Sequence, residues 1–349
     1  MLIAYFLFLI PLDSEATLLN TIWFGVILCI FYTSYTLTML TYYATFSEVT
    51  ENERDALFLS NTKSICDVVY FSLGFALIPL FVSLGINVRV VAIIFAPLCL
   101  SMIIPFLLLD EKNEGDELEV RSLTLPTALK TSFQNKAFII WLGTISIMTV
   151  GLQLFLGGIN ELFSSTGLNM TLVMASSFAP VPLTIMVYNK ITKKYGLGIG
   201  YKYVLTVFTL GMIIMYFCNI NSDKLSNLWL TLIAILGGIF VSFAIGALFS
   251  ITYTVPTNLA REEAERSGKT VSTMYFAVQG LFEGIASGIA TGFILVTLKS
   301  HDIISILPII VAACCAIAFG LSFIFPKSIK DFGRGVDMKK TEDKIEETV

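Results

Sequence analysis

The chain has 349 residues, of which 56% are hydrophobic and only 14% are charged, and its formal net charge is −4. Soluble globular domains contain about 45–50% apolar and about 25% charged residues. This composition therefore excludes an ordinary soluble domain and predicts an integral membrane protein.

The apolar residues are grouped into runs that are long enough to cross a bilayer. A helix needs roughly 17–25 apolar residues to span about 30 Å of hydrocarbon. Because the runs are continuously apolar, we expect helices that satisfy their own backbone, with prolines that kink the helices without breaking them, and no alternating barrel strands. The fold class is predicted as all-α, with about ten transmembrane helices at 1–12 (short), 18–47, 62–85, 89–109, 137–160, 168–190, 199–220, 226–255, 270–298 and 303–325.

The order of these runs indicates an internal duplication. The long run 18–47 is followed by a charged loop at 48–61, and the long run 226–255 is followed by a charged loop at 256–269. The second half then has two more helices than the first, and we interpret residues 1–12 as the remnant of a third helix. The predicted domains are an incomplete bundle at 1–109, a cytoplasmic linker at 110–136 with a short membrane-surface helix, a six-helix bundle at 137–325 and a disordered cytoplasmic tail at 326–349.

The distribution of lysine and arginine predicts the orientation. If loop 48–61 is cytoplasmic, all of the 22 lysines and arginines except Arg89, Lys224 and Lys299 lie on the same side. An excess of these residues marks the cytoplasmic side, so we expect a multi-pass cell-membrane protein with both termini in the cytoplasm. Trp23, Trp141 and Trp229 lie near the starts of their spans and are expected at the membrane interface.

The sequence offers little support for an enzyme or a cofactor protein. The six cysteines lie inside the spans, where they act as small buried hydrophobic residues, and His301 has no companion at metal-ligand spacing. We find no nucleophile–base pair. We therefore predict no catalytic residues, no metal, no cofactor and no nucleic-acid partner, and we expect a monomer in the lipid bilayer.

Glu283 is the first candidate coupling residue because it lies near the centre of span 270–298. An ionised group there costs about 2.5–3.5 kcal/mol on insertion scales. A carboxyl group in a medium of low dielectric constant keeps its proton more readily than one in water, which suits a proton carrier, and with further oxygens it could hold Na⁺. The alternative is a protonated carboxyl that only hydrogen-bonds across the bundle. Gln279 and Ser287 flank it one turn away, and Gly280, Gly284, Gly288 and Gly292 form a stripe that is expected to allow close helix packing.

Asp67 is the second candidate coupling residue. Lys63 lies one turn earlier on the same predicted helix, near its cytoplasmic end. A local ion pair or gate contact between the two is one interpretation. Contact with the substrate or the coupling cation is the other.

The helix 18–47 carries a hydroxyl-rich face with aromatic rings beside it. Such a face suits a sugar, whose hydroxyls need hydrogen bonds and whose C–H faces stack on rings. Alternatively, these hydroxyls bond to other helices or to their own backbone. The predicted substrate-binding residues are Gln279 and, on this helix, Ser34, Tyr35, Thr38, Thr41, Tyr42 and Thr45.

Two motifs resemble a known family. The segment TYYATFSEVTENERDAL at 41–57 resembles the end of helix four and the following loop of the glycoside-pentoside-hexuronide:cation symporters, the melibiose permease relatives of the major facilitator superfamily. The segment SGKTVSTMYFAVQGLFEG at 267–284 is similar to their loop before helix eleven and the start of that helix.

The resemblance implies a major facilitator-type bundle with two pseudo-symmetric halves that rock around a central site. The chain departs from the family pattern because its helix-two equivalent is missing, Met39 is neutral where helix four would carry an acid, and Glu283 stands near a lysine of some relatives. Coupling to H⁺, to Na⁺ or to neither therefore stays open.

We therefore predict a secondary active transporter for a small polar solute, a sugar or glycoside. The alternatives are a transport-inactive membrane protein with a regulatory or sensor role, and a carrier for a non-sugar solute. The charged repeat loops would form a cytoplasmic gate, with ion pairs that each contribute about 0–1 kcal/mol. The predicted gating residues are Glu53, Arg54, Lys63, Arg261 and Arg266.

Overall fold

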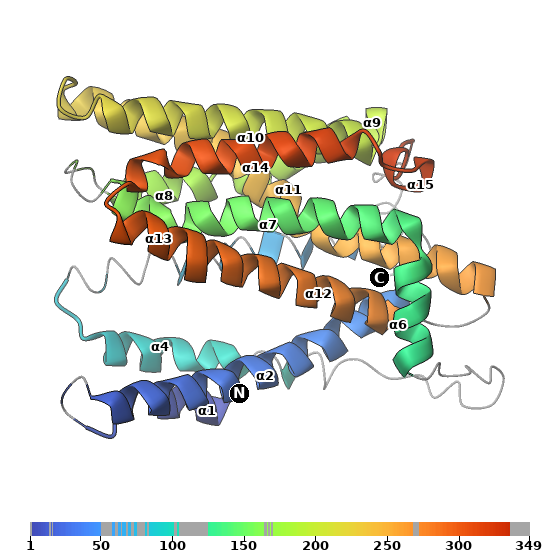
Figure 1. The fold of residues 1–349 in the computed structure, drawn as a ribbon, viewed down its shortest axis with the longest axis horizontal. Coiled ribbons are helices and arrows are strands. Elements are labelled where there is room, and N and C mark those ends of the chain that lie inside the picture. The colour runs from blue at the N-terminus through green and yellow to red at the C-terminus, as the bar shows by residue number, and fades with distance from the viewer. Residues whose placement is uncertain are drawn as a thin grey trace, which may run out of the picture. The chain divides into compact units, whose positions relative to one another are not determined.

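The computed structural model consists of helices, and the described residues contain no strand (Figure 1). They divide into two units: Met1–Thr45 with Leu77–Arg121, and Phe46–Ala76 with Ser122–Val349. The prediction of an all-α fold is confirmed. The structure describes residues 2–13, 15, 17–49, 58–59, 62–63, 65–67, 69–70, 73–74, 81, 84–100, 103–104, 125–163, 166, 168, 170–267 and 272–335.

Within these described ranges, seven helical segments are long and apolar enough to cross a membrane. Each overlaps one of the predicted runs, and a shorter apolar helix covers Arg89–Leu98. The run 62–85 lies largely outside the described residues. The seven segments are Leu18–Met39, Lys136–Leu162, Leu172–Tyr195, Leu197–Ile220, Asn227–Glu263, Met274–Ser300 and Ile304–Ser322.

The first unit contains helices α1 (Leu2–Phe8), α2 (Leu18–Val49, whose last residues belong to the second unit) and α4 (Val88–Leu100). The Tyr5 hydroxyl of α1 donates to the Ala92 carbonyl of α4 at 2.7 Å. Asn20, at the start of α2, accepts from the backbone N–H groups of residues 12 and 13 at 3.0 Å and donates to two carbonyls of the same turn. One buried amide therefore satisfies the backbone of the turn between α1 and α2.

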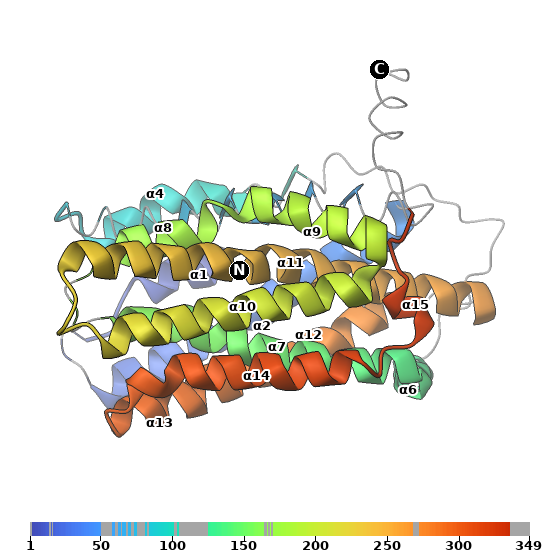
Figure 2. The ribbon, with the colours of Figure 1, turned by 90° about the horizontal axis from the view of Figure 1, so that it is seen from above.

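In the second unit the long helices run side by side (Figures 1 and 2). Helix α10 packs against α9, α11 and α14, helix α7 packs against α12 and α14, and α6 lies across the end of the bundle against α7 and α12. The elements are α6 (Leu125–Gln134), α7 (Lys136–Leu162), α8 (Met170–Phe178), α9 (Val181–Tyr195), α10 (Leu197–Ile220), α11 (Asn227–Ser267), α12 (Ser272–Gly288), the π-helix η1 (Ile289–Ile294), α13 (Leu295–Ser300), the 3₁₀-helix η2 (Ile304–Ile306), α14 (Leu307–Ser322) and α15 (Lys327–Lys330).

Small residues and aromatic rings set the packing of this unit. A Cβ added to Gly211 of α10 would lie 3.0 Å from the carbonyl oxygen of Gly237 on α11, so these two helices approach at their glycines. Towards one end, the rings of Phe138 and Tyr275 pack with centroids 4.4 Å apart. Close approach and ring packing are the sources of stability available to helices in lipid, where apolar burial between helices gains little.

The prediction of a loop at 256–269 is wrong for most of its length, because α11 continues to Ser267. Side-chain pairs one turn apart support the extension: Asn258 donates to Glu262 at 3.0 Å, and Arg266 pairs with Glu263 at 3.1 Å. Pro256 lies inside the helix and removes only one backbone hydrogen bond. A charged segment was thus mistaken for a loop although it forms a polar helix end.

The prediction that prolines do not break helices is right at Pro97, which lies inside α4, whereas at Pro180 two helices meet within one apolar segment, Leu172–Tyr195. The predicted helix 168–190 is two helices, α8 and α9, separated by a turn at Ala179 and Pro180. Pro180 and Pro182 are two residues apart, so two backbone N–H donors are missing from one turn.

The predicted disorder of the tail is wrong for residues 326–335. The Leu197 N–H donates to the Phe332 carbonyl at 3.0 Å, and the Gly335 N–H donates to the Lys193 carbonyl at 2.9 Å. Gly196, with φ 87°, makes the turn from α9 to α10 on which this segment rests. Ile329 and Phe332 are buried there. Residues 336–349 lie outside the described part of the chain.

Ile329→Ala is expected to lower the free energy of unfolding by about 2–5 kcal/mol, since it empties a fully buried site under the α9–α10 turn. Ile324→Ala is the matched control, because Ile324 is 61% exposed whereas Ile329 is 1% exposed. Thermal unfolding of both purified variants in detergent is the measurement. Equal stability of the two variants would show that the C-terminal segment does not pack as described.

Candidate functional site

Glu283 lies on α12 within a hydrogen-bonded network that joins three helices. The Gln279 amide nitrogen, Nε2, donates to Glu283 Oε1 at 3.1 Å and to the Thr252 carbonyl of α11 at 2.8 Å. The Trp141 indole Nε1–H of α7 donates to Gln279 Oε1 at 2.7 Å. Gln279 therefore connects Glu283 to both neighbouring helices.

The partners determine which way the Gln279 amide points. An indole N–H only donates, so it requires the amide oxygen, and a backbone carbonyl only accepts, so it requires the amide nitrogen. The two sides of the amide are thus assigned by its contacts. Glu283 Oε1 therefore meets an N–H donor of this amide.

Burial changes the interpretation of two residues. Trp141 is 0% exposed and Gln279 is 2% exposed. Trp141 is therefore not an interfacial residue as predicted, because its indole N–H has a partner inside the bundle. Gln279 uses its oxygen and its nitrogen within the protein, an arrangement that favours a positioning role over direct contact with a solute.

The glycine stripe of α12 and η1 does not pack closely against the described residues. A Cβ added at Gly280, Gly284, Gly288 or Gly292 would meet no described atom within 4 Å. Helix α12 contacts α7 and α11 through another face, which includes the buried residues Tyr275, Val278 and Gln279. The expected close contact at the stripe is therefore not met within the described part of the chain.

Lys63 and Asp67 form the ion pair that their spacing suggested. Lys63 is buried, and its Nζ lies 3.9 Å from the centre of the Tyr253 ring on α11. A desolvated cation over an aromatic face contributes about 2 kcal/mol or more. The pair therefore ties the segment that precedes α4 to α11, one residue from the Thr252 carbonyl that accepts from Gln279.

The hydroxyl face of α2 is described in part. Ser34, Thr38 and Tyr42 are half-buried, and Tyr35 is exposed with its ring stacked on Phe31 at 6.4 Å. The Thr38 hydroxyl donates to the Ser34 carbonyl at 2.8 Å, as the alternative interpretation expected, and its lone pairs can still accept. The side chains of Thr41 and Thr45 lie outside the described residues.

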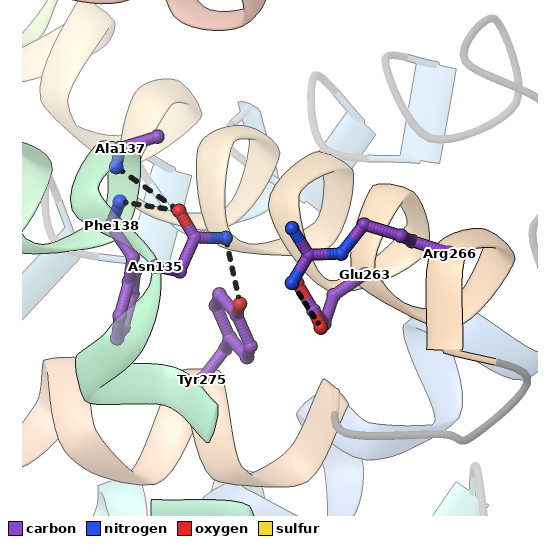
Figure 3. Close-up of polar contacts among 6 residues, drawn as sticks. All are labelled: Asn135, Ala137, Phe138, Glu263, Arg266 and Tyr275. Carbon is purple, nitrogen blue, oxygen red and sulfur yellow. Dashed lines mark hydrogen bonds and ion pairs between the residues drawn. The ribbon is translucent and has the colours of Figure 1, made fainter. Parts of the chain in front are cut away.

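Two of the remaining gating candidates, Arg261 and Arg266, lie in the last turns of α11. Glu53 and Arg54 lie outside the described residues, so the predicted exchange of ion pairs between the two charged segments remains a prediction. Arg261 donates to Asn258 Oδ1 at 3.0 Å, and Arg266 pairs with Glu263, which is buried (Figure 3).

Near Arg266, Asn135 joins the start of α7 to α12. Its Oδ1 accepts from the Ala137 and Phe138 N–H groups, and its Nδ2 donates to the Tyr275 hydroxyl at 2.9 Å (Figure 3). An open pocket of about 420 Å³ adjoins this cluster and is lined by residues 134–137, Glu262, Glu263, Arg266 and Ser328. The lining therefore carries both acidic and basic side chains.

Glu283 is the carboxyl group of the network around Gln279. In the described ranges, no group of three or more His, Cys, Asp or Glu side chains could hold a metal ion. The sequence predicts roles for Glu283 and Gln279, whereas Trp141 and the Thr252 carbonyl are added to the network by the structure. The sequence does contain a sign that the Thr252 carbonyl lacks its helical partner, because Pro256, which has no N–H, follows Thr252 by four residues.

Comparison of the sequence with known proteins identifies the family of the chain. None of the curated protein sequences compared with the chain matches it. The model of the family described as MFS/sugar transport protein matches residues 1–320. Because this match covers most of the chain, the protein belongs to the MFS/sugar transport family and is a multi-pass membrane transporter of the major facilitator type.

Proposed function

We propose that this transporter moves a small polar solute, a sugar or glycoside, by alternating access, and that Glu283 couples the movement to H⁺ or Na⁺. The observation that carries the proposal is the Glu283 carboxyl, which is fixed by Gln279 within an otherwise apolar span. An ionised carboxylate inside a membrane span has a high free-energy cost, so a residue of this kind that is retained is a candidate for function. The family description supports the class of solute.

The fixed amide suggests how Glu283 takes up its cation. Gln279 donates to Oε1, so a proton or Na⁺ would bind at Oε2. Cation binding neutralises the carboxylate. The transporter then avoids the free-energy cost of burying a charge in the low-dielectric interior when it changes conformation. Rocking of the two helical bundles would then be favoured in the loaded state.

The solute would bind to the hydroxyl face of α2. Ser34, Thr38 and Tyr42 offer hydroxyl groups, and Tyr35 offers a ring on which a sugar C–H face can stack. Thr41 and Thr45 would extend this face along the same helix.

The gate would lie on the cytoplasmic side, where both termini would also lie. Lys63 and Asp67 would hold α11 in one state of the gate. In the other state Glu53 would form ion pairs with Arg261 or Arg266, and Arg54 would pair with acidic groups of the second charged segment. Asp67 would be the second residue to sense the coupling cation, because a cation bound there competes with Lys63.

Glu283→Gln is expected to abolish cation-driven accumulation in proteoliposomes, since the amide cannot take up a proton or balance Na⁺. A pH gradient of one unit supplies about 1.4 kcal/mol per proton, which supports about tenfold accumulation of the solute. The measurement is uptake of labelled sugars at imposed pH and Na⁺ gradients, with Ser287→Ala as a neighbouring control. Downhill exchange should persist in Glu283→Gln.

Two results would contradict this proposal. Equal accumulation by Glu283→Gln and the wild type would remove Glu283 from the coupling mechanism. No uptake of any sugar by folded wild-type protein would favour the transport-inactive alternative.

Lys63→Met is expected to slow uptake by at least about fivefold, because loss of the counter-ion leaves Asp67 uncompensated at a cost of about 1 kcal/mol or more. The double variant Lys63→Met/Asp67→Asn should lose less than the single variant. Initial rates at saturating solute measure both. Additive losses would mean that the pair does not act as a unit.

A further inference from the structure

Pro256 lies inside the long helix α11, four residues after Thr252. In an α-helix the backbone N–H of a residue donates to the carbonyl four residues earlier, and proline has no N–H. The Thr252 carbonyl is therefore without its usual donor from position 256. In lipid, such a carbonyl needs another partner.

That partner comes from another helix. Gln279 Nε2 on α12 donates to the Thr252 carbonyl oxygen at 2.8 Å. The same nitrogen donates to Glu283 Oε1, and the amide oxygen accepts from Trp141. The carbonyl that Pro256 leaves unbonded is thus one of the two points outside α12 that hold the Gln279 amide.

The contact depends on the backbone of Thr252 and not on its side chain. The Thr252 hydroxyl donates to the Leu248 carbonyl of its own helix at 2.7 Å. Replacement of the threonine side chain should therefore leave the link to Gln279 intact, whereas a residue with an N–H at position 256 should compete for the carbonyl.

We infer that Pro256 is a positioning residue: by withholding its N–H from the Thr252 carbonyl, it anchors the Gln279 amide and thereby fixes the donor that faces Glu283. The effect on transport rests on the proposed function of Glu283. The anchoring itself does not, so the two parts can be tested separately.

The test uses Trp141 as a reporter, because its indole N–H bonds directly to Gln279. The chain has three tryptophans, so Trp23→Phe/Trp229→Phe leaves Trp141 as the sole indole. In this background we compare Pro256→Ala, Gln279→Leu and the double variant by tryptophan emission. Alanine is a much better helix former than proline, so Pro256→Ala should fold.

We expect Pro256→Ala to shift the Trp141 emission in the same direction as Gln279→Leu, and the double variant to shift it no further than Gln279→Leu alone. Thr252→Val is the control for the side chain, and Pro97→Ala, in α4, is the control for removal of a helix proline. Neither control should change the emission. An unchanged emission in Pro256→Ala, or shifts that add in the double variant, would overturn the inference.

Transport then separates this inference from the proposed function. If Glu283 couples transport, Pro256→Ala should lower the cation-driven accumulation of the solute several-fold. The double variant Pro256→Ala/Gln279→Leu should accumulate as much solute as Gln279→Leu alone. Full accumulation by Pro256→Ala, in a protein whose Glu283→Gln variant is uncoupled, would overturn the positioning role. If Glu283→Gln transports normally, the proposed function fails while the emission result still decides the anchoring.

Discussion

The arrangement of the site depends on the need to satisfy polar groups where no water is available. Gln279 meets this need for several groups at once, since it accepts from the Trp141 indole and donates to both the Thr252 carbonyl and Glu283. Each of these bonds leads to a different element or to the carboxyl itself. Loss of the amide would remove the hydrogen-bond acceptor of the Trp141 indole and the donor to the Glu283 carboxyl, both inside the bundle. One side chain therefore couples the packing of three helices.

The same constraint explains where the helices tolerate interruption. Pro256 lies inside an unbroken helix because a side chain of α12 occupies the carbonyl that it leaves. Pro180 and Pro182 remove two donors within one turn, and the helix ends there. Between α9 and α10, Gly196 takes a positive φ, and the C-terminal segment bonds to the backbone on both sides of the turn. Irregular backbone is thus found where protein groups supply its partners.

Much of this fold could be predicted from the sequence, because the length of an apolar run is set by the thickness of the bilayer. The seven described spans follow from that rule, and Glu283 follows from the cost of placing an ionisable group inside such a span. Trp141 was misplaced because position within a span does not say whether a residue faces lipid or protein. The end of α11 and the C-terminal segment were missed because charge was taken as a sign of loop or disorder. Ile329 and Phe332 show that a few apolar residues in a polar segment are enough to anchor it.

The network also limits how Glu283 can act. Rotation of the Gln279 amide would turn its oxygen towards the Thr252 carbonyl and its nitrogen towards the Trp141 N–H, and would place like groups together at both contacts. The amide is therefore held with its N–H towards Oε1 for as long as the three helices stay packed. Because Gln279 donates to Oε1, the proposed coupling cation would meet the carboxyl at Oε2. A motion that separates α11 from α12 would break the bond to the Thr252 carbonyl. The Gln279 amide would then be held from outside α12 by the Trp141 indole alone, while its bond to Glu283 lies within α12.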